Sequence, residues 1–263
     1  MTFLKPADHE LAEAFLGNGH VVHSAEDRQG LNRIRTRAAE LAAGHLGADV
    51  PADIGGFLNA IHETVGVETL NALRLAVFNG LNKEEWFRPT YFSLARTTIE
   101  SLVGNELCMQ RRLNLSIQMP DDDSSLLPVH ADVWDGDSPF EVVLWVPLVD
   151  CFDTKAMYLL RPGKNRVVQE NLSKFGDGNA EDIFEAIADD VEFIKISYGE
   201  VMVFSQTLMH GNRVNRVPET RWSMNCRFKS VMSPFADKKL GEFFEPITLR
   251  AATRMGLDYK LPE

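Results

Sequence analysis

The sequence has few cysteines, no long apolar run and no excess of positive charge. Only 3 of its 263 residues are cysteine and none lies in a Cys-x-x-Cys pair, which excludes a disulfide framework and a zinc ribbon. Apolar runs such as residues 141–149 are far shorter than the roughly 20 residues that a membrane helix needs. Residues 1–10 show no basic stretch followed by an apolar one, so we expect no signal peptide. With 27 basic and 38 acidic residues, the formal charge is −11, and we do not expect nucleic acid to be the main partner.

The overall composition is that of a folded protein. A hydrophobic share of 44% excludes disorder as the main state, and the length fits one large domain or two small ones. We predict a single cytoplasmic domain over residues 1–263. It would consist of a helical region at 1–110, a β-rich core at 111–232 with an insert at 170–192, and a helical tail at 233–263.

Helical spacing of apolar residues dominates the first part of the chain. It predicts one helix around residues 31–42, a second from Asp53 or Gly55 to residue 82, and a third over residues 90–107. A short helix is expected at 180–190, and two more in the tail at 237–244 and 246–255. These helices would support the core that follows.

From residue 111 the period changes from helical to two. Residues 113–119 and 221–229 alternate strictly between apolar and polar side chains, which is typical of strands with two different faces. Short apolar runs at 140–149, 157–160, 191–196 and 201–204 are separated by turn-type segments such as 135–137, 161–165 and 176–179. Several short strands joined by such turns predict a β-sandwich or barrel within an α+β protein.

The strand predicted at 221–229 indicates where a site would lie. Its apolar face needs a cover, which the N-terminal helices would supply. Its polar face would then line an interior cavity, unless it simply faces solvent. The apolar residues are Trp222, Met224, Cys226 and Phe228, and the polar ones are Arg221, Ser223, Asn225, Arg227 and Lys229.

A possible metal site begins at His130 and Asp132. On a strand, positions i and i+2 point the same way, so this imidazole and this carboxylate would reach one metal ion. His210 follows a predicted buried strand, Arg221 follows His210 after ten intervening residues, and Ser223 lies two positions beyond Arg221. A His-x-Asp alone arises often by chance, but the five positions at this spacing do not.

At these residues the chain resembles the iron(II)- and 2-oxoglutarate-dependent oxygenases. Residues 127–132 resemble the first metal motif of that family, and residues 199–223 its second. Residues 155–165 are similar to the strand and turn between them in the phytanoyl-hydroxylase-like branch. The similarity extends over residues 111–232, and residues 239–248 resemble a bacterial subgroup found with surface-carbohydrate or sugar-antibiotic genes.

The resemblance implies a double-stranded β-helix of the jelly-roll or cupin-like kind, with iron(II), 2-oxoglutarate and O2 as reactants and ascorbate as a reductant in vitro. His130, Asp132 and His210 would hold the metal. Arg221 would pair with the distal carboxylate of 2-oxoglutarate, with a hydrogen bond from Ser223. Because halogenases of this family lack the carboxylate ligand, the Asp indicates hydroxylation or a related desaturation, cyclisation or epimerisation.

Three polar residues on the strand before the metal motif are further candidates for the cosubstrate site. Asn114 or Gln118 would contact the C1 side of 2-oxoglutarate, and Ser116 would approach C5. The alternative is an ordinary polar strand face.

Four residues are candidates for the substrate side. Trp134 and Trp145 either wall the site or belong to the core. Asn225 and Arg227 continue the cosubstrate strand towards the substrate, although Arg227 would alternatively pair with a structural acid.

The expected substrate is a small molecule: a sugar, an aminocyclitol or a nucleotide-sugar, with lipids and amino acids left open. Five basic residues either hold an anionic substrate or balance the acidic surface: Arg161, Lys164, Arg213, Arg216 and Arg227. Two other classes remain open, namely another cupin-like metalloenzyme (an isomerase or zinc hydrolase) and a silent binding protein with the same fold. The sequence leaves the oligomeric state undetermined.

Overall fold

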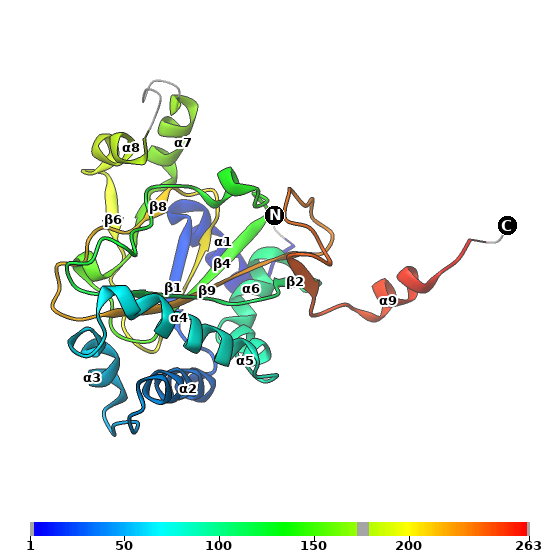
Figure 1. Ribbon diagram of the computed structural model, residues 1–263. Helices are drawn as coiled ribbons and strands as arrows, with labels where there is room; N and C mark the ends of the chain where they lie inside the picture. Colours follow the sequence, from blue (N-terminus) through cyan, green and yellow to red (C-terminus); the bar gives the residue numbers. More distant parts are fainter. Residues whose placement is uncertain (1–2, 173–178, 262–263) are drawn as a thin grey trace.

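Two antiparallel sheets form the centre of the computed structural model, which describes residues 3–172 and 179–261 (Figure 1). The large sheet has the strand order β1-β7-β4-β9-β2-β10, and β3 also pairs with β9. The small sheet has the order β6-β5-β8. The large sheet comprises β1 His20–Ser24, β2 Leu107–Gln110, β3 Asn114–Gln118, β4 Glu141–Pro147, β7 Glu200–Ser205, β9 Arg221–Ser230 and β10 Phe244–Pro246, and the small sheet β5 Tyr158–Leu160, β6 Val191–Phe193 and β8 His210–Gly211.

Strand β9 is the element on which the site is built. It pairs along one edge with β4, and along the other with β3 and then β2. The register sets Asn114 opposite Asn225 and Ser116 opposite Ser223. Because directly opposed residues share a face of a sheet, the polar side chains of β3 and β9 lie on one surface. Lys229 is the exception to the predicted polar lining: it is buried and donates to the carbonyl of Ser233 at 2.8 Å.

N-terminal helices cover the other face of β9, as the alternation predicted. The cover consists of α2 Arg28–Leu46, α3 Ile54–Asn59, α4 Val67–Asn82, α5 Phe87–Ser93 and α6 Arg96–Val103, with α1 Pro6–Asn18 beside β1. The fully buried Trp222 joins their core, and its indole N–H donates to the carbonyl of Leu58 at 2.8 Å. Phe228 packs on Phe92 of α5 with ring centroids 5.8 Å apart.

The first 110 residues contain two strands that the periodicity did not predict. β1 pairs with β7 at one edge of the large sheet, and β2 pairs with β9. The helix predicted up to residue 82 is two helices, because a 3-10 turn at Ile61–Glu63 and the extended Gly66 separate α3 from α4. The helix predicted at 90–107 is likewise divided between α5 and α6.

Two predictions in the second half were wrong. The segment predicted as a turn at 161–165 begins α7 Pro162–Glu170, because proline fits the first helical position. No helix forms at 237–244; Gly241 adopts φ +88° and β10 pairs instead with β2. The only tail helix among the described residues is α9 Ala251–Asp258, on a segment that extends away from the body (Figure 1).

The insert carries α8 Ala180–Ile187, which begins at Asn179 as a side-chain cap and bears out the short helix predicted there. Residues 173–178, with most of the turn predicted at 176–179, lie outside the described part of the chain. Among the described residues, no helix combines the length and apolar character needed to cross a membrane.

Candidate metal and cosubstrate site

Three predicted metal ligands converge at one side of a cavity. His130 forms an isolated β-bridge with His210, and Asp132 opens the 3-10 turn Asp132–Asp135. One ligand atom from each lies within 4.8 Å of the other two. The carboxylate Oδ1 is 3.6 Å from Nε2 of His130 and 4.0 Å from Nε2 of His210. Two imidazoles and one carboxylate in this arrangement suit a non-heme iron site that keeps open positions.

Backbone carbonyls orient both imidazoles. Nδ1 of His130 lies 2.8 Å from the carbonyl of Pro128, and Nδ1 of His210 lies 2.9 Å from that of Leu208. A carbonyl only accepts hydrogen bonds, so each Nδ1 carries the proton when the ring is neutral. Each Nε2 is then left as the lone-pair donor, which is the usual outer support of a metal-binding histidine.

Burial and neighbouring charges set the protonation states of the ligands. Burial lowers the pKa of His210 to about 4, so this imidazole is neutral at neutral pH. Burial opposes the ionised form of Asp132, but the hydrogen bond with His130 and nearby positive charges hold its pKa well below the usual range. Burial also acts against protonated His130, yet the carboxylate of Asp132 outweighs it and raises the pKa. A carboxylate and a neutral His210 are the forms that a metal binds.

A second layer of charge stands behind Asp132. Nη2 of Arg227 donates to Oδ1 of Asp132 at 2.9 Å, and Nε of Arg227 lies 3.3 Å from Oδ1 of Asp137. Asp137, whose side chain is fully buried, is also paired with Lys238. Arg227 therefore pairs with acids, which was one of its two predicted roles.

The chain after β9 is fastened to the loop that carries Asp132. The N–H groups of Asp237 and Lys238 donate to the carbonyl of Gly136 at 3.1 and 3.2 Å. The hydroxyl of Ser138 donates to the carbonyl of Pro234 at 2.7 Å. We call residues 234–238 the C-terminal strap. From the sequence, residues 135–137 were predicted only as a turn, because no local pattern indicates that this loop pairs with the tail.

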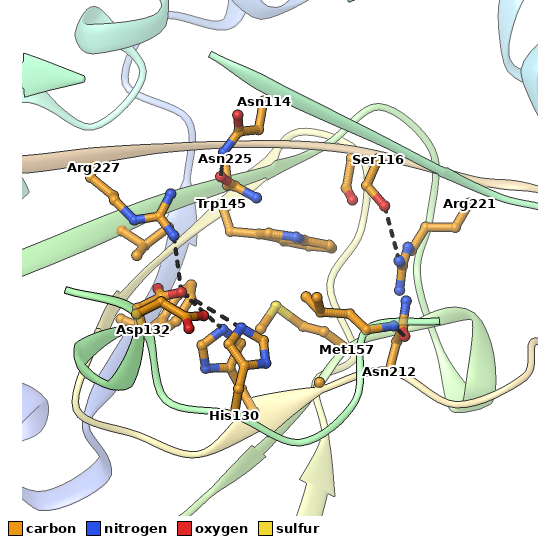
Figure 2. Close-up of a pocket in the computed structure, with 17 residues that line it drawn as sticks. Asn114, Ser116, His130, Asp132, Trp145, Met157, Asn212, Arg221, Asn225 and Arg227 are labelled. Atoms are coloured by element: carbon orange, nitrogen blue, oxygen red, sulfur yellow. Dashed lines mark hydrogen bonds and ion pairs between the residues drawn. The ribbon is translucent and has the colours of Figure 1, made fainter. Parts of the chain in front are cut away.

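A cavity of about 290 Å³ opens beside the triad. In Figure 2, His130 and Asp132 lie at one side of it, Arg221 and Ser116 at the other, and the indole of Trp145 between them. Seven predicted cosubstrate or substrate residues line it: Asn114, Ser116, Trp145, Arg221, Ser223, Asn225 and Arg227. Seven further residues complete the lining, and none was assigned a site role from the sequence: Leu127, Asp135, Val143, Met157, Phe204, Gly211 and Asn212.

Two predicted residues lie elsewhere. Gln118 is buried beside β9, outside the lining, and its amide donates to the carbonyl of Arg213 at 2.6 Å. Trp134 is 39% exposed and does not line the cavity.

Arg221 presents an unsatisfied cation to the cavity. Its Nη2 donates to the hydroxyl of Ser116 at 3.2 Å, but its buried Nε and Nη1 have no protein partner among the described residues. The buried hydroxyl of Ser223 also lacks one there. Burial lowers the pKa of Arg221 to about 10, so the group stays charged at neutral pH. Buried donors without partners are costly, and a ligand carboxylate would satisfy them.

The five basic residues considered for an anionic substrate are engaged elsewhere. Only Arg227 lines the cavity. Each of the five contacts an acid: Arg161 with Glu192, Lys164 with Asp190, Arg213 with Glu181, Arg216 with Asp121, and Arg227 with Asp132 and Asp137. This pairing favours the interpretation that they balance acidic groups.

The architecture is the jelly-roll, cupin-like fold of non-heme oxygenases, which confirms the predicted fold class. No protein-family model and no curated protein matches the sequence. Solved structures do match. The nickel complex of the non-heme monooxygenase ThoJ has a TM-score of 0.57 and 17% identity over 91% of this chain and 84% of that one.

Two further neighbours were solved with 2-oxoglutarate. HygX from Streptomyces hygroscopicus, with nickel and 2-oxoglutarate bound, has a TM-score of 0.53 and 12% identity over 90% of each chain. EctD from S. alaskensis, with 2-oxoglutarate and 5-hydroxyectoine, has a TM-score of 0.51 and 16% identity over 89% of this chain and 80% of that one. At such identities the likeness establishes the fold, and the site must be argued from its own residues.

Proposed function

We propose that this protein is an iron(II)- and 2-oxoglutarate-dependent oxygenase that oxidises an unactivated C–H bond of a small polar molecule. One observation carries the proposal: a convergent His-Asp-His triad shares a cavity with a buried arginine and a buried serine whose polar atoms are not all satisfied by the described residues. The triad fits a metal, and the unsatisfied donors fit the far carboxylate of a dicarboxylic cosubstrate.

Each group in the cavity has a definite task in this reaction. The bound metal, 2-oxoglutarate and O2 would supply the oxidising chemistry. His130, Asp132 and His210 would hold the metal from one side and leave its other positions open. Arg221 would bind the distal carboxylate through its planar fork, which a lysine cannot match, and Ser223 would add a hydrogen bond.

The remaining lining residues would position the substrate and exclude water. Ser116 already contacts Arg221, so it belongs to the cosubstrate end of the cavity. The amide of Asn114 donates to Oδ1 of Asn225 at 2.9 Å, which forms a polar wall above Trp145 (Figure 2). Met157, Val143 and Phe204 add apolar surface to the lining, which would strengthen polar contacts by excluding water when the cavity is filled.

Of the three substrate classes expected from the sequence, a sugar, an aminocyclitol and a nucleotide-sugar, we infer one of the first two. The cavity volume of about 290 Å³ matches a small molecule, and its wall combines amides with an indole face. The EctD structure was solved with 2-oxoglutarate and 5-hydroxyectoine, which supports a small-molecule substrate. We also predict from the sequence that the protein is a single domain, that it lies in the cytoplasm and that it does not bind nucleic acid.

Another cupin-like metalloenzyme, such as an isomerase or zinc hydrolase, is the second candidate. It would use the same triad, but it would have no need for a buried, unsatisfied guanidinium in the same cavity. Arg221 therefore favours the oxygenase.

The deciding experiment measures succinate formed from 2-oxoglutarate with iron(II), ascorbate and oxygen, with a panel of sugars, cyclitols, amino acids and lipids. We expect succinate from the wild type and none from His210→Ala. His45→Ala, changed at an exposed position of α2, is the matched control and should behave as the wild type. Absence of succinate together with absence of 2-oxoglutarate binding to the nickel-loaded protein would overturn the proposal in favour of the second candidate.

A further inference from the structure

The charges that line the cavity are almost all committed before a substrate enters. This inference rests on the proposed function, in which His130, Asp132 and His210 serve the metal and Arg221 serves the cosubstrate. Arg227 is the only other cation in the described lining, and Asp132 and Asp137 already engage it. No cation of the described lining is therefore left for the substrate.

One anion in the lining is left over. Asp135 ends the 3-10 turn that begins with Asp132, lines the cavity and is exposed. The structure shows no hydrogen bond or ion pair for its carboxylate among the described residues. The neighbouring acid, Asp137, differs in being buried and paired with Arg227 and Lys238. The carboxylate of Asp135 acts electrostatically on His130, but in the described lining no hydrogen bond or ion pair neutralises it.

The neutral part of the lining suits a polyhydroxylated ring. Asn114 and Asn225 contribute two amides, which share one hydrogen bond and keep further donor and acceptor capacity. The amide of Asn212 is held by the N–H of Leu127 and the carbonyl of Ser125. The indole of Trp145 offers a flat apolar surface between Asn225 and His130 (Figure 2). Such a lining binds hydroxyl groups and ring faces without requiring a charged substrate.

We propose that the substrate is an amine-bearing sugar or cyclitol whose ammonium group pairs with Asp135. An aliphatic amine is protonated at neutral pH, like that of lysine, and a carboxylate is its natural partner. A nucleotide-sugar fits poorly, because its diphosphate needs cations that the lining does not have free. Its charge would also face the repulsion of Asp135.

The test compares matched ligand pairs by calorimetry on the protein loaded with nickel(II) and 2-oxoglutarate, so that no turnover occurs. The pairs are scyllo-inosamine against scyllo-inositol and glucosamine against glucose, with UDP-glucose as the anionic probe. We expect each amine to bind roughly tenfold more tightly than its hydroxyl counterpart, as for one charge-assisted hydrogen bond at a partly exposed site. The preference should shrink at high salt.

Asp135→Asn should remove this preference, because it keeps the size of the side chain and loses the charge. Asp49→Asn, an equal charge change in an exposed segment after α2, should leave it intact. Four results would each overturn the inference. They are equal binding of the two ligands in each pair, tightest binding of UDP-glucose, no binding of either amine, and a preference for the amines that survives in Asp135→Asn. If the nickel-loaded wild type does not bind 2-oxoglutarate, the proposed function is overturned, and the inference with it.

Discussion

Replacing Arg221 by methionine should stabilise the protein on its own and remove its response to 2-oxoglutarate. The reason is that the guanidinium is buried at the start of β9, with two nitrogens that have no protein partner among the described residues. A buried cation without a counter-ion lowers the free energy of unfolding, and we expect a bound ligand with a negative charge to offset this loss. Methionine fills similar space and carries no charge.

The size of the effect follows from the pKa. Burial lowers the pKa of Arg221 from 12.5 to about 10, and a shift of this size corresponds to about 3 kcal/mol. The variant loses the hydrogen bond to Ser116, which is worth about 1 kcal/mol. We therefore expect the free energy of unfolding to rise by about 2 kcal/mol without 2-oxoglutarate. At about 1,000 times its Kd, the cosubstrate should add about 4 kcal/mol to the wild type alone.

The assay is urea unfolding with nickel(II) present throughout, with and without 2-oxoglutarate. The expected signature is a reversal of order: the variant is the more stable protein without cosubstrate and the less stable one with it. Arg216→Met, at an exposed arginine paired with Asp121, is the matched control and should change stability by no more than about 0.5 kcal/mol. The reasoning is refuted if Arg221→Met is destabilising without cosubstrate, or if it retains the stabilisation by 2-oxoglutarate.

Three further predictions concern the surroundings of the site. Lys238→Met removes one of two cations that hold Asp137 and should weaken nickel(II) binding about tenfold by calorimetry. Lys238→Arg should restore binding and the exposed Lys239→Met should not alter it; unchanged affinity in Lys238→Met would refute a positioning role for the strap. Burial raises the pKa of Glu141 from 4.5 to about 7. Between these two pH values the carboxyl group is therefore protonated in the folded protein and ionised in the unfolded one. Its contribution to stability is full below about pH 4.5 and is lost by up to about 3 kcal/mol as the pH rises to about 7. Glu141→Gln should lack this part of the pH dependence in urea unfolding from pH 4 to 8, and an identical slope in both proteins would contradict it. Trp222→Phe should lower the free energy of unfolding by about 1 to 3 kcal/mol through a lost hydrogen bond and a void, with nickel(II) affinity unchanged; a parallel loss of affinity would show that the helical side reaches the site.

The parts of the site that could be predicted are those with a local signature. His130 and Asp132 are two positions apart in the sequence, and ten residues separate His210 from Arg221. The combination of these spacings singled the residues out. The faces of β9 were equally readable, because strict alternation has one structural meaning for a strand. The cosubstrate roles of Asn114 and Ser116 stay predictions, although both lie in the cavity.

What could not be predicted depends on contacts between distant segments. β1 has only five residues and lies between two helices, so its strand character comes from pairing with β7 rather than from its own pattern. The strap is invisible for the same reason: Asp137 and Lys238 are about a hundred residues apart, and neither belongs to a recurring motif. Tertiary pairing, which the chain does not display locally, decides such elements.

The same limit applies to charge, and it bears on specificity. A basic residue in a sequence looks available for an anionic ligand, but in the folded protein Arg161, Lys164 and Arg216 each form an ion pair with an acidic residue. Discrimination comes from groups that a ligand must satisfy, because an unpaired buried or cavity group rejects every ligand that cannot pair with it. Among the charged groups of the described lining, buried Arg221 and exposed Asp135 are the two that have no ion-pair partner. Because the two charges have opposite signs, the same cavity should favour a carboxylate at Arg221 and a cation at Asp135, and this selectivity follows from the pairing of Arg227 and Asp132 with each other.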